Sequence, residues 1–92
     1  VRLFMKEWTK NFKALANENR LEILRVLAKD RELSVRMICH KLDRRVKMVS
    51  KHLGILSRMG FVEGTGKLGS VWYKLHPKLH PEIKHIITKF LK

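Results

Sequence analysis

Apolar residues recur every three or four positions over residues 3–16, which predicts an amphipathic helix. A second helix is predicted to begin at Asn19, because Glu22 stands three positions later and such a pair can satisfy the free amides of a first turn. The residues after it are apolar on nearly every side, so we expect this helix at the centre of the core. The apolar face of the first helix would carry Phe4, Trp8, Phe12 and Leu15.

A third and a fourth helix follow after short polar breaks. The hydroxyl of Ser34 can cap the third, in which apolar residues fall at helical spacing. The fourth is predicted from about Arg45 to Met59, with Gly60 in the position where a left-handed residue often ends a helix. Three closely joined helices of this kind are typical of a helix-turn-helix unit.

The spacing of apolar residues changes from helical to alternating after the fourth helix. Residues 61–75 read as two strands around a glycine-rich tip, because apolar and polar residues alternate in the second strand. Pro81 stands where a last helix, residues 81–92, would start. At 92 residues with 45% hydrophobic content, the chain predicts one domain over residues 1–92. The predicted fold class is α+β: four helices, a β-hairpin and a C-terminal helix.

The charge balance limits the classes of partner that this protein is expected to bind. The chain has 21 Lys and Arg against 8 Asp and Glu, a net charge of +13. Such a field favours polyanions, with nucleic acid first and an anionic membrane second. No apolar run approaches the roughly 18 residues that span a bilayer, so we expect a cytoplasmic protein without a membrane partner. The single cysteine, Cys39, lies on an apolar helix face and is expected to be a packed small residue.

The fourth helix combines a core side with a basic side. A helical wheel sends Val46, Val49, Leu53 and Leu56 to one side. The outer side is small or basic and contains no carboxylate: Lys47, Ser50, Lys51, Gly54, Ser57 and Arg58. Gly54 makes the helix less stable by roughly 1 kcal/mol relative to alanine, which favours a partner that approaches the backbone closely. The alternative is a merely solvated face on a basic protein. A helix-turn-helix with a following hairpin is the arrangement that places its second helix in a DNA major groove.

Three segments carry a family resemblance: FKALANENRLEILRVLA, VSKHLGIL and MGFVEGTGKLGSVWYKL. Together they resemble the ArsR/SmtB-type winged helix-turn-helix repressors of bacteria and archaea. The resemblance implies that DNA contacts come from the fourth helix and from the hairpin, called the wing, at Lys47, Ser50, Lys51, His52, Gly54 and Lys67. His52 also lies near the core side of the wheel, so it is either a base-reading residue or a packed structural histidine.

The chain departs from the family pattern before the fourth helix. Arg44 and Arg45 stand where family members usually have a leucine and a serine cap. Either the two arginines clamp phosphates, or the helix begins earlier with Asp43 as its cap. We include both arginines, with Arg58, among the expected DNA contacts.

We expect no metal and no cofactor. Many family members release DNA when a metal binds, some through a Cys-x-Cys pair at the start of the third helix. Ser34 and Arg36 occupy the corresponding positions here. Soft metals need converging thiolates, which an arginine cannot replace. A zinc site on the C-terminal segment is the less favoured alternative, and no arrangement of enzyme groups is evident. Whether any inducer exists is left open. The candidate zinc ligands are His76, His80, Glu82 and His85.

The function predicted is that of a homodimeric repressor that binds a pseudo-palindromic site in double-stranded DNA. The alternative is an architectural or protein-docking module with little sequence preference. We expect the terminal helices, residues 1–16 and 81–92, to form the dimer, because they offer more apolar surface than one small domain can cover. The expected interface residues are Phe4, Trp8, Phe12, Ile83, Ile86, Ile87, Phe90 and Leu91.

Overall fold

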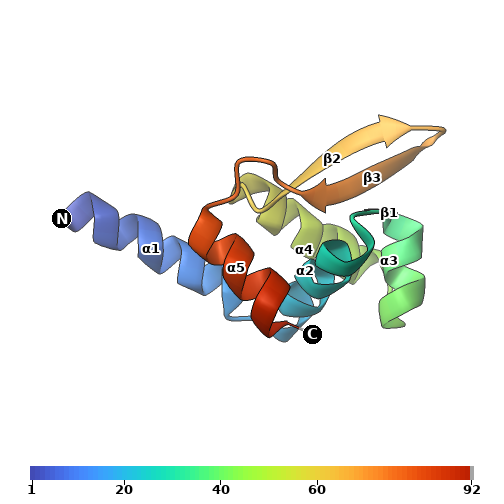
Figure 1. The fold of residues 1–92 in the computed structure, drawn as a ribbon. Coiled ribbons are helices and arrows are strands. Elements are labelled where there is room, and N and C mark those ends of the chain that lie inside the picture. The colour runs from blue at the N-terminus through green and yellow to red at the C-terminus, as the bar shows by residue number, and fades with distance from the viewer. Residues whose placement is uncertain (92) are drawn as a thin grey trace.

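A computed structural model describes residues 1–91 of the chain (Figure 1). The predicted α+β class is confirmed, because five helices accompany one small antiparallel sheet in this range. In chain order the elements are α1 (Arg2–Leu15), α2 (Glu18–Asp30), β1 (Glu32–Ser34), α3 (Val35–Leu42), α4 (Val46–Arg58), β2 (Val62–Lys67), β3 (Ser70–Leu75) and α5 (Pro81–Phe90).

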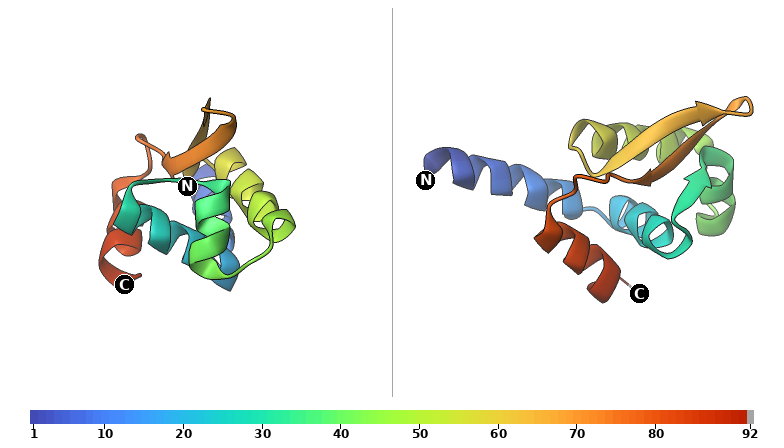
Figure 2. Two further views of the ribbon diagram at one scale, coloured as in Figure 1. Left: turned by 90° about the vertical axis from the view of Figure 1, so that its right-hand side faces the viewer. Right: turned by 45° about the horizontal axis from the view of Figure 1, so that its top comes forward.

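Helix α2 lies at the centre, as its nearly continuous apolar character predicts. It packs against α3, α4, α5 and the sheet, and Figure 2 shows α4 and α5 on opposite sides of it. Helix α1 is different, because only its C-terminal part meets α2 and the rest extends away from the body (Figure 1). The molecule is therefore elongated, with extents of 43 × 25 × 22 Å. The shared core includes Ile23, Leu24, Leu27, Ile38, Val49, Leu53, Leu56 and Phe61.

The sheet contains a strand that the sequence pattern did not predict. β1 pairs antiparallel with β3 on the side away from β2, so the strand order is β1-β3-β2. The hairpin itself was predicted, and it closes with a two-residue turn at Leu68 and Gly69, between the paired residues Lys67 and Ser70. Both turn residues have positive φ, 53° and 76°. This is the backbone of a type I′ turn, whose twist matches that of the flanking strands.

The helix ends confirm one predicted cap and correct another. The hydroxyl of Ser34 accepts a hydrogen bond from the backbone N–H of Met37 at 3.2 Å, as predicted. The second helix is capped by Asn17 and not by Asn19, because the Asn17 side chain accepts from the N–H of Arg20 at 3.1 Å. Asp43 is no N-cap for α4, since its left-handed backbone (φ 52°) ends α3. Helix α4 begins at Val46.

The expected dimer residues fall into three groups. Ile83 and Ile87 were wrongly predicted as interface residues, because their side chains are 1% and 0% exposed and belong to the protomer's own core. The helical pattern could not show which apolar turns of α5 face α2. Trp8, Ile86 and Leu91 are half-buried. Phe4, Phe12 and Phe90 remain exposed, as the prediction requires.

Arg20 connects three helices at the point where α1 meets the body. Its Nε donates to the carbonyl of Ala14 at 2.6 Å and its Nη2 to that of Lys13 at 2.9 Å, so it binds carbonyls of the last turn of α1. The Lys13 carbonyl also accepts from the N–H of Ala16 at 3.3 Å. Its Nη1 lies 3.4 Å from Nδ1 of His52, on α4. An arginine can only donate, so this nitrogen of His52 acts as the acceptor of a neutral imidazole.

Of the two alternatives for His52, a base-reading residue or a packed structural histidine, its burial and its contact with Arg20 favour the second. Its residue is 6% exposed, on the buried side of α4. Burial lowers the pKa of His52, and the positive charges of Arg20 and Lys51 lower it further. Protonation would leave two cations facing each other where Arg20 now donates to a lone pair.

We predict that this histidine makes the fold sensitive to acid. A lowered folded-state pKa means that the unfolded chain binds the proton first, so stability is present above the ordinary histidine pKa and is lost as pH falls through the folded-state pKa. Urea unfolding at pH 7, 6 and 5 should show the loss, and His52→Gln should have a shallower dependence because its amide oxygen still accepts from Arg20. Parallel pH profiles for the two proteins would contradict the assignment.

Candidate nucleic-acid interface

Helix α4 presents a basic outer face beside α3. We call Lys47, Ser50, Lys51, Gly54 and Arg58 the recognition face. All but the half-exposed Gly54 are exposed, and none of its three cations forms an ion pair within 4.0 Å in the described part of the chain. The opposite side of the helix is buried at Val49, Leu53 and Leu56. The apolar contacts thus hold the helix while its cations stay available to a polyanion.

Gly54 has no packing role inside the protomer. A Cβ built on it would meet only Nη1 of Arg58, at an ordinary contact distance of 3.6 Å. The helix could therefore hold alanine there without a clash. The packing around Gly54 in the described residues therefore gives no reason for a glycine at this position.

The N-terminus of α4 is open to an anion. Arg45 occupies the N-cap position without a side-chain hydrogen bond to the first turn, and that turn contains no acid. The free amides and the helix dipole both favour a negative ligand there. Arg44 is exposed too, but its guanidinium donates to the carbonyls of Leu42 and Asp43 at the end of α3. Arg45 is thus the freer of the two predicted phosphate contacts, and Val46, predicted on the core side, is 59% exposed beside it.

The predicted wing contact, Lys67, lies at the end of β2 next to the turn. Its Nζ is 2.7 Å from Oε1 of Glu32 and 5.5 Å from the ring centre of Trp72. The tip residue is Leu68, which is 95% exposed. The sequence signal that could have identified it is the two-residue spacing between the strands, which leaves Leu68 and Gly69 as the turn.

The histidines near the C-terminus are dispersed. Nδ1 of His76 accepts from the N–H of Lys78, and Nδ1 of His80 accepts from the N–H of Glu82. The ring of His80 packs edge-on against Trp8 at 4.8 Å, and that of His85 against Phe90 at 6.2 Å. Across residues 1–91, no three His, Cys, Asp or Glu side chains converge as metal ligands would. Burial raises the pKa of the half-buried Cys39 thiol, which disfavours the thiolate that a soft metal needs.

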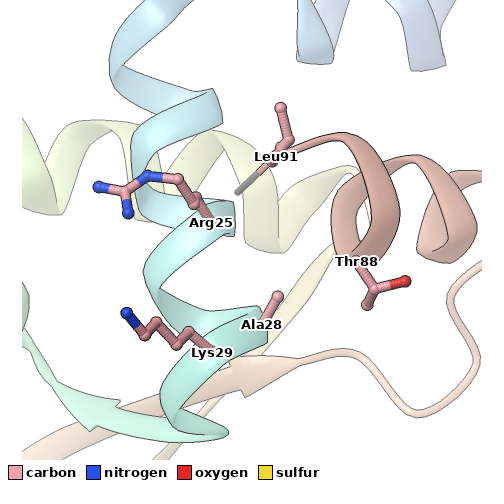
Figure 3. Close-up of a pocket in the computed structure, with 5 residues that line it drawn as sticks. All are labelled: Arg25, Ala28, Lys29, Thr88 and Leu91. Carbon is pink, nitrogen blue, oxygen red and sulfur yellow. The ribbon is translucent and has the colours of Figure 1, made fainter.

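A hollow of about 320 Å³ between α2 and α5 is the other concave feature of interest (Figure 3). Ala28 points toward α5, whereas Arg25 and Lys29 extend away from it. Arg25 is also paired with Glu22 at 2.9 Å, and the Thr88 hydroxyl donates to its own helix at Lys84. These groups do not converge on a common point, so the hollow lacks the geometry of an active site. None of the helices described is long and apolar enough to cross a bilayer.

Comparison with known proteins identifies related families and structures. A model of the family described as HVO_A0114 matches residues 15–74, which extend from the end of α1 to the wing. The transcriptional activator HlyU of Vibrio cholerae is 41% identical over 63 residues. The structure of reduced HlyU from that species has a TM-score of 0.82 and 34% identity, and the match covers 94% of this chain and 86% of that one.

Two further relatives extend the comparison. The arsenical resistance operon repressor of Escherichia coli is 35% identical over 68 residues, which are 74% of this chain and 58% of the repressor. The homodimeric winged helix-turn-helix DNA-binding domain of Mb0332 from Mycobacterium bovis shares the fold at 24% identity and a TM-score of 0.79, over 94% of this chain and 76% of that one.

The chain spans little more than half the length of the curated relatives that it matches. Its segment nevertheless contains the complete helix-turn-helix and wing, and the predicted resemblance is confirmed. The chain belongs to the ArsR/SmtB-type family of winged helix-turn-helix transcriptional regulators.

Proposed function

We propose that the protein is a sequence-specific, homodimeric DNA-binding repressor and not an enzyme. The observation that carries this proposal is the recognition face of α4. Its cations are exposed and have no ion-pair partner among residues 1–91, and they lie opposite a fully buried apolar side. A solvated basic face needs neither the open N-terminus of α4 nor a glycine that its own protomer does not require. The expected contacts are Arg44, Arg45, Lys47, Ser50, Lys51, Gly54 and Arg58, with Lys67 and Leu68 on the wing.

We further propose that the protein acts as a repressor and that no metal controls it. Relatives include both an activator and a repressor, so the name of a relative does not decide the direction of regulation. A DNA-binding domain most simply represses by occupying a site that polymerase needs. Ser34 caps α3 with its hydroxyl, and Arg36 is exposed, so neither residue offers a thiolate to an inducing metal.

The dimer is proposed to use α1 and the end of α5. Along α1, the exposed apolar residues Leu3, Phe4, Met5 and Phe12 have no cover in the protomer. Beside them a groove of about 530 Å³ is lined by Trp8, Phe61, Leu79 and His80, among others. A second copy is the occupant we propose, because a two-fold pairing also presents two α4 helices to successive major grooves about 34–36 Å apart. Mb0332, which has the same fold, is a homodimer.

Binding-site selection from random duplexes tests the function directly. We predict enrichment of a pseudo-palindromic sequence, and weaker binding to it by Lys47→Ala and Lys51→Ala with unchanged melting temperature. A lysine that reads a base should account for about 1–3 kcal/mol of discrimination, whereas one on a phosphate should lower the magnitude of the salt slope by about 0.9. An unenriched pool bound equally by all variants would favour the architectural module instead.

The variant Gly54→Ala distinguishes an effect on folding stability from an effect on DNA binding. Because a Cβ fits the protomer, we predict that alanine raises the free energy of unfolding by roughly 0.5–1 kcal/mol. The same methyl should weaken binding to the selected duplex, since it stands between the α4 backbone and the DNA. Chemical denaturation and a binding titration on one preparation measure both effects. A more stable protein with unchanged affinity would remove Gly54 from the interface.

Association can be tested without damage to the core. Phe12 is 57% exposed on α1, so Phe12→Glu should give a folded monomer with reduced operator affinity. Met37→Glu is the matched control, because Met37 is 44% exposed on α3 and outside the proposed interface. Sedimentation equilibrium at micromolar concentration measures both variants. A monomeric parent protein would contradict the proposed dimer.

A further inference from the structure

Helix α1 carries a second basic surface that the recognition face does not include. Arg2, Lys6, Lys10 and Lys13 are spaced by four, four and three positions, so they form one stripe, the α1 basic stripe, along a helix about 21 Å long. All four side chains are exposed. None has an ion-pair partner within 4.0 Å among residues 1–91. The one acid of α1, Glu7, lies about 100° around the helix from the centre of the stripe.

The stripe lies next to the recognition face. Lys10 and Lys13 line one hollow together with Ile55 of α4 and with Met59, which follows the end of that helix. Ile55 follows Gly54 and is one helical turn after Lys51, so this flank of α4 borders the recognition face. Met5 and Thr9 lie on the same side of α1 as the stripe. Figure 2 shows α1 running on past the C-terminal end of α4. The cations of α1 thus continue those of α4 beyond the end of that helix.

The aromatic residues of α1, Phe4, Trp8 and Phe12, are turned to a different side. Trp8 packs edge-on against His80 of the segment before α5 and tilts against Phe12 at 5.6 Å. Phe4 and Trp8 line the groove beside that segment. A helix that lies on a membrane inserts its apolar face. Trp8 is half-buried against the protein's own body, and the proposed partner copy would cover the exposed Phe4 and Phe12, so the stripe is the part of α1 that stays free.

We infer that the α1 basic stripe binds phosphates of the same DNA duplex, next to those contacted by α4. The inference rests on the proposed DNA-binding function and extends its interface by one helix. The contacts are electrostatic and carry no sequence information. They increase affinity for every duplex long enough to reach α1, and they make binding more dependent on salt because each neutralised phosphate releases counterions.

The experiment compares three double variants with the parent protein. Lys6→Gln/Lys10→Gln removes two charges from the stripe, and Lys84→Gln/Lys89→Gln removes two from α5, on the other side of α2 from α4 (Figure 2). Lys47→Ala/Lys51→Ala removes two from the recognition face. Fluorescence anisotropy with the selected duplex and a random duplex, from 50 to 200 mM salt, gives the affinity and the salt slope of each. Melting curves verify that every variant is folded.

We expect the stripe variant to bind both duplexes severalfold more weakly, with a salt slope smaller in magnitude by about 2 and unchanged preference for the selected sequence. The α5 variant should match the parent protein. A stripe variant that matches the α5 control, while the Lys47/Lys51 variant binds weakly, would overturn this inference and leave the proposed function intact. A parent protein without preference for the selected duplex would overturn the proposed function. Binding to phosphatidylserine vesicles provides the alternative outcome. If only the stripe variant loses vesicle binding while its DNA affinity is unchanged, the stripe binds a membrane and the inference is overturned.

Discussion

Arg20 joins the end of α1, the start of α2 and the buried side of α4 through a single guanidinium group. Two of its nitrogens donate to the carbonyls of Lys13 and Ala14, and a third faces Nδ1 of His52. Because α1 has few other contacts with the body, these bonds set the direction in which it leaves the core. That direction decides where both its apolar and its basic residues lie. The proposed dimer and the proposed phosphate contacts therefore depend on the same arginine.

Helix α4 can have two different sides because only its buried side supplies the free energy of packing. Val49, Leu53 and Leu56 are fully buried against neighbouring elements, and each such side chain contributes about 1.5–3 kcal/mol. The outer side therefore adds nothing that the fold requires, and it can hold lysines and a glycine. His52 stands at the border and belongs to the packed side. Protonation of that ring affects the position of the helix and not a base contact.

The two ends of the chain are used unequally. Helix α5 buries Ile83 and Ile87 against its own protomer and leaves Phe90 outside, whereas α1 keeps most of its apolar residues exposed. In a dimer closed through α1, the partner would cover Phe4 and Phe12 while the stripe of Arg2, Lys6, Lys10 and Lys13 stayed in solvent. One helix could thus serve association on one side and DNA on another, because its apolar and basic residues are about half a turn apart.

The sequence by itself determined the helices, the hairpin, the Ser34 cap and the basic outer side of α4, because local periodicity and capping chemistry depend only on neighbouring residues. Tertiary structure decided what depends on partners distant in the chain. β1 exists because three residues pair with β3. A helical wheel does not show which apolar turns of α5 contact α2. It also does not show that Arg20 lies beside His52. These outcomes depend on contacts across the fold, which periodicity does not contain.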